Sequence, residues 1–284
     1  TYIFFDEIQH VTDFPDIINS LNLKPTVDLY VTGSNAYMLS SEIATLLSGR
    51  YVEIAMLPLS FKEYAEGIGG TDHLPQTYIE YVSKSSFPYT LELDTANEIS
   101  DYLNAVYNTI VVKDIMSRNK LSDVMMLESV IRFTADNIGN ILSTKRIADL
   151  MSADGRKIDQ KTVEKYLSTL CESFFLYEVK RYNIKGKQLL KTLGKYYLVD
   201  IGLRRMLLGS RSFDAGRILE NIVFLELLRR QKKVYIGKMD NLEVDFVAID
   251  ENDLAYYQVA ATVRDEKSLK RELASLQQIK DQYP

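Results

Sequence analysis

The sequence has little cysteine, histidine or tryptophan. It contains one cysteine, Cys171, two histidines, His10 and His73, and no tryptophan among 284 residues. A single cysteine excludes an internal disulfide and suits a reducing compartment, so we expect a cytoplasmic protein. One cysteine and two distant histidines also fall short of the four ligands of a structural zinc site. The chemistry of this chain therefore rests on other side chains.

Long apolar runs are absent as well. No stretch approaches the roughly 20 uninterrupted apolar residues that a membrane helix needs, so we expect no membrane partner. With 46% hydrophobic and 26% charged residues, the composition is that of an ordinary soluble protein. A chain of this length is expected to form two or three domains, each with its own core.

Basic residues are scarce in the first third of the chain and concentrated further on. Residues 1–100 carry four Lys or Arg against fourteen Asp or Glu, whereas residues 156–197 carry ten against four. A basic segment within an acidic chain indicates contact with a polyanion. Solvated lysines on a small domain give the same pattern, so both interpretations stay open.

Polar side chains follow two apolar runs near the start of the chain. One run ends in the adjacent carboxylates of Asp6 and Glu7, and the next in Ser34 and Asn35. Parallel strands end at one edge of a sheet, where nucleotides bind in α/β folds. There Asp6 would hold Mg²⁺ and Glu7 would orient or activate water. Asn35 or Ser34 would bond that water or the γ-phosphate. Two solvated acids at a helix or loop start are the plain alternative.

These motifs resemble the Walker B and sensor-1 strands of AAA+ ATPases. Such proteins also carry a phosphate-binding loop, G-x-x-x-x-G-K-[ST], and no match to it occurs in these residues. We therefore interpret the chain as a fragment of a longer protein. ATP and Mg²⁺ binding is expected of the intact protein, and only weak ATP binding of the fragment.

Alternating strand and helix patterns over residues 1–60 predict part of a parallel α/β sheet. Strands are predicted at 2–5, 27–32 and 51–56, and helices at 13–22 and 38–47. Residues 61–140 show helical periodicity without a strand signal, comparable to the helical lid of an AAA+ core. The predicted helices of this region lie at 61–66, 75–83, 98–115 and 121–137.

Residues 141–212 have the helix–turn–helix–hairpin pattern of a winged helix. Helices are predicted at 143–150 and 159–172, and strands at 174–182 and 189–199. The second helix would read DNA, because Lys161 and Lys165 are four residues apart on one face. Lys185 and Lys187 flank the glycine at the tip of the hairpin. Many winged helices bind protein or brace a neighbour instead, so DNA contact is one of two alternatives.

Residues 213–284 resemble a restriction-endonuclease-like α/β domain. A helix from 216 is followed by strands at 233–236, 243–249 and 254–261 and by a helix at 265–280. Glu220, Asp245 and Gln258 match its acidic frame, in which carboxylates hold Mg²⁺ and a lysine assists the attacking water. Here the last acidic position is the neutral Gln258, and the lysine position is Ala260. We therefore expect a degenerate scaffold without nuclease activity.

The full arrangement resembles a largely uncharacterised family of archaeal and bacterial AAA+ superfamily ATPases with these C-terminal regions. The motifs that carry the resemblance lie at 4–9, 32–36, 47–50, 58–61, 216–221 and 243–246. The resemblance implies that Asp6 is the Mg²⁺ carboxylate, Glu7 the catalytic base, and Asn35 or Ser34 the sensor. It makes Arg50 either an arginine finger, which would act within a homo-oligomer, or a structural cap on the carboxylates.

The sequence thus favours an ATP-driven switch in the intact protein, with DNA as the leading candidate target. The alternative is a non-catalytic DNA- or protein-binding scaffold with degenerate ATPase and nuclease-like regions.

Overall fold

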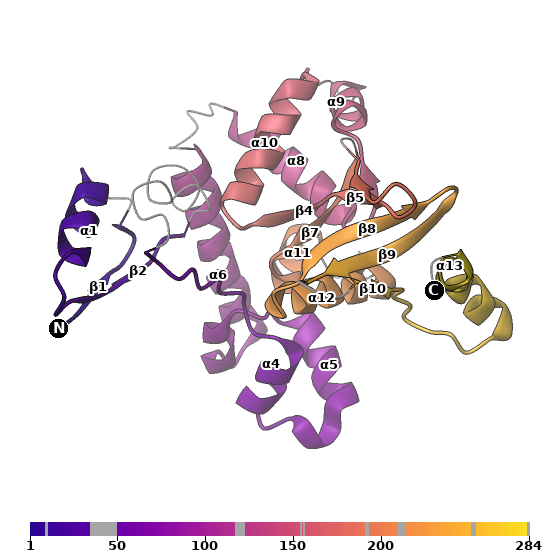
Figure 1. Cartoon of the computed structure of the whole chain (residues 1–284), viewed down its shortest axis with the longest axis horizontal. Coiled ribbons are helices and arrows are strands. Elements are labelled where there is room, and N and C mark those ends of the chain that lie inside the picture. Colours follow the sequence, from indigo (N-terminus) through magenta and orange to yellow (C-terminus); the bar gives the residue numbers. More distant parts are fainter. Residues whose placement is uncertain are drawn as a thin grey trace.

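The computed structural model describes residues 1–8, 11–34, 50–116, 123–153, 155, 157–190, 193–209, 214–250 and 254–282. Four regions follow one another along the chain (Figure 1). They are a small N-terminal α/β unit, a helical region, helices with a three-stranded sheet, and a C-terminal sheet flanked by helices. The mixed α/β class predicted from the sequence is confirmed. No helix within the described ranges is both long and apolar enough to cross a membrane.

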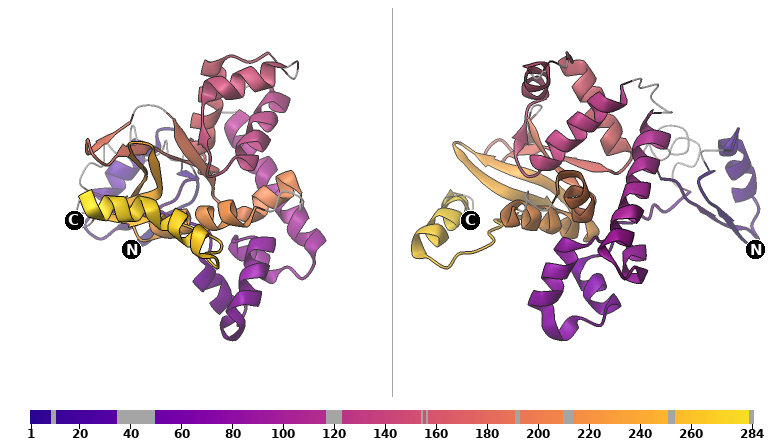
Figure 2. Two further views of the ribbon diagram at one scale, coloured as in Figure 1. Left: turned by 90° about the vertical axis from the view of Figure 1, so that its right-hand side faces the viewer. Right: turned by 180° about the vertical axis from the view of Figure 1, so that it is seen from behind.

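The N-terminal unit is a parallel pair of strands joined through one helix. Strand β1 (Tyr2–Phe5) pairs with β2 (Asp28–Val31), and α1 (Phe14–Asn22) lies between them in the chain. Ile8 and Ile18 are each 1% exposed and form the small core of this unit. The parallel pairing predicted for this region is therefore confirmed. The unit lies at the opposite end of the molecule from the C-terminal helix (Figures 1 and 2).

The strand predicted at 51–56 is wrong. Residues 51–57 have no strand conformation, and the side chains of Val52, Ile54 and Met56 are 88%, 77% and 89% exposed. The alternation of large apolar side chains with other residues at 51–56 is typical of a strand. A strand also needs a neighbouring strand to form hydrogen bonds with its backbone N–H and C=O groups. Within the described residues the N-terminal sheet consists of β1 and β2. The helix predicted at 38–47 lies outside the described residues.

The helical region begins where the sequence predicts. Its helices are α4 (Phe61–Gly67), η2 (Thr71–His73), α5 (Leu74–Ser83), η3 (Pro88–Glu92), α6 (Ala96–Asn108), η4 (Thr109–Met116) and α8 (Val124–Asp136). A capping box fixes the start of α4: Glu63 N donates to Ser60 Oγ at 3.1 Å, and Ser60 N donates to Glu63 Oε2 at 2.7 Å. Thr95 and Glu98 form the same box at α6.

A three-stranded antiparallel sheet with helices follows. Its elements are β3 (Ile141–Leu142), α9 (Thr144–Ala153), α10 (Gln160–Glu172), β4 (Leu176–Val179), β7 (Gly194–Leu198) and α11 (Ile201–Leu208). The strand order is β3-β7-β4, so β7 is the central strand. Strand β3 and helix α11 were not predicted. Between β4 and β7 the chain forms a hairpin of β5 (Arg181–Asn183) and β6 (Gln188–Leu189), which joins the C-terminal sheet.

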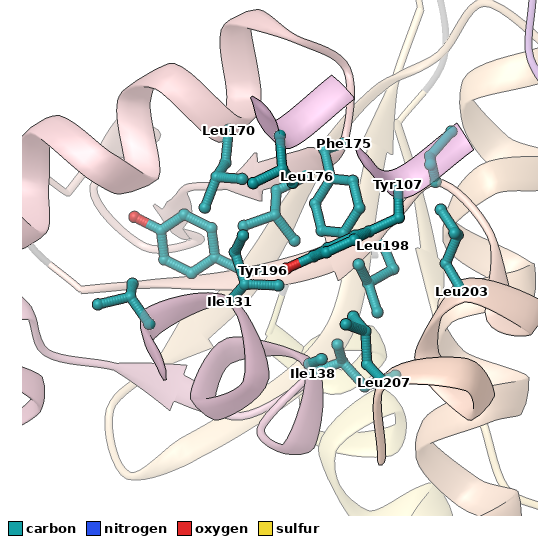
Figure 3. Close-up of a cluster of buried hydrophobic side chains, with 14 of the residues drawn as sticks. Tyr107, Ile131, Ile138, Leu170, Phe175, Leu176, Tyr196, Leu198, Leu203 and Leu207 are labelled. Atoms are coloured by element: carbon teal, nitrogen blue, oxygen red, sulfur yellow. The ribbon is translucent and has the colours of Figure 1, made fainter. Parts of the chain in front are cut away.

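One hydrophobic core runs through the helical region and the three-stranded sheet (Figure 3). It combines Tyr107 of α6, Ile131 of α8, Leu170 of α10, Leu198 of β7 and Leu203 of α11. Packing is therefore continuous across the domain boundary predicted at residue 141, and the predicted domain limits remain predictions.

The C-terminal region is a five-stranded sheet between two helices. Its own elements are α12 (Ala215–Arg229), β8 (Lys233–Met239), β9 (Leu242–Ile249), β10 (Leu254–Tyr257) and α13 (Glu266–Gln282), and the strand order is β10-β9-β8-β5-β6. Phe224 of α12 and Ile279 of α13 belong to separate cores. Tyr197 of β7 stacks on Phe224 with ring centroids 4.6 Å apart. Strand β7 therefore contributes to the C-terminal core as well.

We predict that Phe224→Ala destabilises the three-stranded sheet and the C-terminal sheet together. Phe224 is 2% exposed, and truncation of such a side chain to Ala costs about 3–5 kcal/mol. Urea unfolding followed by circular dichroism measures the loss. Ile79→Ala on α5, at a side chain 58% exposed, serves as the control with little expected change. A loss below about 1 kcal/mol at Phe224 would contradict this packing.

Candidate functional site

The carboxylates predicted to bind nucleotide lie at the carboxyl edge of the β1–β2 pair. Asp6 and Glu7 directly follow β1, and Thr32 and Ser34 follow β2. The Thr32 hydroxyl donates to Asp6 Oδ1 at 2.5 Å. The Ser34 hydroxyl donates to Glu7 Oε2 at 2.9 Å. The structure thus brings Asp6, Glu7 and Ser34 together from two segments that are far apart in the chain.

The backbone turns sharply at these carboxylates. Glu7 has φ 49°, in the left-handed region that side chains with a Cβ rarely adopt. Glu7 N donates to Thr32 Oγ1 at 3.2 Å, and Ile8 N donates to Thr32 O at 3.3 Å, which holds the turn against the end of β2. Residues in such sparsely populated conformations gather at functional sites. Thr32 was not predicted as a site residue, although its place at a strand end before Gly33 was a signal.

The carboxylate pair has the donor chemistry that Mg²⁺ prefers. Mg²⁺ binds oxygen ligands, through one or two carboxylates together with substrate phosphates. Asp6 is exposed and Glu7 is half-buried, so solvent ions reach this edge of the sheet. Asn35 lies outside the described residues. Arg50 is exposed, and both of its predicted roles remain predictions.

Helix α10 presents lysines on its outer face. Val163, Tyr166 and Leu167 are buried in the core, whereas Lys161 and Lys165 are exposed, as the spacing predicts. Asp159 caps the helix N-terminus, and its carboxylate accepts a hydrogen bond from Thr162 N at 2.9 Å. Glu164 is also exposed and accepts a hydrogen bond from the Gln160 side chain at 2.8 Å, so the face is mixed in charge.

Lys185 and Lys187 lie in the β5–β6 hairpin. The Lys185 ammonium is 2.5 Å from Asp240 Oδ2, in the turn between β8 and β9. Lys187 is exposed. Because this hairpin extends the C-terminal sheet, it is not the free wing that the sequence predicts for a winged helix.

The predicted acidic frame of the C-terminal region surrounds a buried lysine. The Lys195 ammonium lies 3.0 Å from Glu220 Oε1, 3.0 Å from Glu243 Oε1 and 3.7 Å from Asp245 Oδ1. Lys195 comes from β7, Glu220 from α12, and Glu243 and Asp245 from β9. Lys195 is only 4% exposed. We call these four residues the Lys195 cluster. Two of its carboxylates, Glu220 and Asp245, were predicted to lie together.

Other hydrogen bonds surround the cluster. The Tyr197 hydroxyl donates to Glu220 Oε1 at 2.6 Å, and Val259 N donates to Asp245 Oδ2 at 2.8 Å. Gln258, the third predicted member of the frame, donates from Nε2 to Glu272 at 3.1 Å. Its Oε1 atom is buried without a hydrogen-bond partner in the part of the chain that the structure describes. Gln258 therefore forms its hydrogen bond with Glu272 of α13 and not with the cluster.

Burial and charge shift the proton affinities of the Lys195 cluster. Burial by itself would lower the pKa of the Lys195 ammonium, but the carboxylates of Glu220, Glu243 and Asp245 outweigh it and raise that pKa. The lysine is therefore protonated at neutral pH. Burial raises the pKa of Asp245 to about 6, with Glu220 and Glu243 adding to the shift.

Sequence reasoning missed Lys195, Glu243 and Tyr197. It sought a lysine near the acidic positions in the chain, whereas Lys195 stands 25 residues before Glu220. One signal was present: Lys195 is a single charged residue within an otherwise apolar strand pattern at 194–199. A fully buried strand carries a charge only where a partner neutralises it.

Comparison with known proteins gives the family. Residues 1–65 match an AAA domain, and residues 75–214 match a domain of unknown function, DUF8612. An uncharacterized protein of Haemophilus influenzae is 40% identical over 99% of this chain, which spans 70% of that protein. The chain belongs to the same family. The uncharacterized protein MJ1544 of Methanocaldococcus jannaschii is 29% identical over 88% of this chain, which spans 59% of its length.

The match with the AAA domain makes the N-terminal region of this family member ATPase-like. It includes the carboxyl edge of β1 and β2, where Asp6, Glu7 and Ser34 meet. The DUF8612 match runs from α5 to Asp214, through the helical region and the three-stranded sheet that share one core.

We predict that Asp245 makes stability depend on pH. Its native pKa of about 6 lies above the ordinary Asp value of about 4, so the native chain binds the proton more tightly. The ionised carboxyl therefore disfavours the native state above about pH 6, and this cost disappears as the pH falls to about 4. Urea unfolding measures the effect. As the pH falls from about 7.5 to about 4.5, the stability of the unmodified protein should rise relative to that of Asp245→Asn. A pH-independent difference would contradict the raised pKa.

Proposed function

We propose that the intact protein binds and hydrolyses ATP with Mg²⁺ at the carboxyl edge of β1 and β2. The observation that carries this proposal is the contact of Ser34 with Glu7 beside Asp6, within the region that matches the AAA domain. In such sites a metal ion neutralises the charge on the phosphates, while neighbouring side chains position the attacking water.

Each side chain at this edge then has a separate role. Asp6, fixed by the Thr32 hydroxyl, is the residue to hold the metal. Glu7 is the base that orients or deprotonates water, and Ser34 fixes the Glu7 carboxylate from the next strand. Asn35 and Arg50 keep their sequence-based roles as a sensor and as a finger or cap. A finger role for Arg50 requires a homo-oligomer, because it would act on the nucleotide of a neighbouring subunit.

We predict that Glu7→Gln in the intact protein abolishes ATP turnover and leaves ATP binding in place. The amide has the shape of the carboxylate but cannot accept a proton from water. Phosphate release measures turnover, and equilibrium binding of a fluorescent ATP analogue measures affinity. Glu66→Gln on α4, where the carboxylate pairs with Lys62 at 3.8 Å, is the control and should keep both. Unchanged turnover in Glu7→Gln would exclude Glu7 as the base.

We propose further that residues 141–209, together with the preceding helix α8, form a winged helix that binds DNA. The support is the order of elements, helix α8, strand β3, helices α9 and α10, then β4 and β7, with β7 between the other two strands. In winged helices the helix corresponding to α10 enters the major groove. Lys161 and Lys165 lie on its exposed face. The β5–β6 hairpin belongs to the C-terminal sheet, so α10 is the principal contact in this proposal.

We predict that Lys161→Glu combined with Lys165→Glu weakens DNA binding strongly. Each lost phosphate contact should reduce the slope of log K against log salt by about 0.9. Fluorescence anisotropy with a labelled duplex at several salt concentrations measures both quantities. Lys267→Glu with Lys270→Glu, exposed lysines on the distant α13, makes the same charge change as a control (Figure 1). Equal affinity of the two double variants would contradict a role for α10.

A second function is favoured by the Lys195 cluster. Its carboxylates form ion pairs with a lysine of the same chain, which suits a binding scaffold rather than a nuclease. A scaffold without ATP turnover would bind DNA or protein with an affinity that ATP does not change. ATP-dependent affinity would favour the switch. In either case we place the protein in the cytoplasm.

A further inference from the structure

The acidic frame of the C-terminal region raises the question of which cation neutralises it. Three carboxylates from α12 and β9 converge within 3.7 Å of a single point, the Lys195 ammonium. The side chains of Glu220 and Asp245 are 14% and 15% exposed. Buried carboxylates without a partner repel one another and lose hydration, so such a group needs a positive charge.

With Lys195 in place, the donor set does not fit Mg²⁺. A Mg²⁺ ion at this place would need oxygen atoms directed at it at roughly 2.0–2.1 Å. Glu220 Oε1 accepts hydrogen bonds from both Lys195 and Tyr197, and Asp245 Oδ2 accepts one from Val259 N. The third frame position, Gln258, supplies an amide that bonds Glu272. Among the described residues no group of three acidic, histidine or cysteine side chains has metal-binding geometry.

We propose that Lys195 takes the place of the metal ion in this frame. Its ammonium is the permanent cation of the site, delivered by a strand of the preceding region instead of from solvent. The site then joins β7 to α12 and β9 and cannot perform metal-dependent hydrolysis. This inference is independent of the proposed ATPase and DNA-binding functions.

The local structure explains why Lys195 can serve. Alternate residues of a strand point to the same face, so Lys195 and Tyr197 both reach Glu220 from β7. Lys195 is buried, and its three acidic neighbours supply more negative charge than its own positive charge. The frame therefore retains enough negative charge to attract a divalent ion once the lysine is removed.

The test is divalent-ion binding after the lysine is replaced. All proteins carry Asp6→Asn, so that the carboxylates after β1 do not contribute a metal site. Mn²⁺, which takes oxygen ligands and gives an electron paramagnetic resonance signal, is titrated while the melting temperature is recorded. The Asp6→Asn parent should show no Mn²⁺-dependent stabilisation. In the presence of a chelator, Lys195→Met should melt roughly 10 °C below the parent. Its melting temperature should rise again with Mn²⁺, which binds at one ion per chain.

Two variants control the interpretation. Asp245→Asn added to Lys195→Met should abolish Mn²⁺ binding. Lys232→Met removes a different lysine–carboxylate pair of the same region, 2.9 Å from Asp250, and should remain insensitive to Mn²⁺. If Lys195→Met does not fold, Lys195→Met with Glu243→Gln removes one charge of each sign and takes its place in the same titration.

Two results would overturn the proposal. One is Asp245-dependent stabilisation of the parent by Mn²⁺, which would make the frame a metal site with its lysine in place. The other is a Lys195 variant, single or double, that gains no response to Mn²⁺.

Discussion

The contact between strand β7 and helix α12 is the interaction on which the rest of the structure depends. The Asn221 side chain accepts a hydrogen bond from Leu198 N at 2.9 Å and donates one to Leu198 O at 2.8 Å, and the residue is fully buried. The preceding residue, Glu220, accepts hydrogen bonds from Lys195 and Tyr197. Strand β7 is also the centre of the three-stranded sheet, and it contributes Leu198 to the helical core and Tyr197 to the C-terminal core.

Helix α12 also reaches the connection to the N-terminal unit. Arg229, at its C-terminal end, donates a hydrogen bond to Pro58 O and lies 3.7 Å from the Glu63 carboxylate at the start of α4. The same helix carries Glu220 in its N-terminal half. A displacement of the segment before α4 would therefore act directly on α12, and through it on β7. In the proposed switch, this helix is the mechanical link between the ATPase-like region and the rest.

Local features of the structure could be predicted from the sequence, and non-local ones could not. The helices at 61–66 and 159–172 were predicted because their caps and apolar spacing lie within the segment itself. The strand at 51–56 failed because pairing depends on a neighbour that the pattern does not show. Lys195 was missed for the same reason, since its three partners lie on α12 and β9. Asp6 and Glu7 lie beside the residues that follow β2 because parallel strands end at one edge of the sheet, and their roles remain predictions.

Hydrogen exchange of the intact protein, with and without Mg²⁺ and ATP, tests the central claim most directly. The account predicts that nucleotide slows exchange at residues 6–8 and 32–34, where β1 and β2 end, and alters exchange at 57–60 and the end of α12. Nucleotide-dependent protection elsewhere, with unchanged exchange at 6–8 and 32–34, would contradict it.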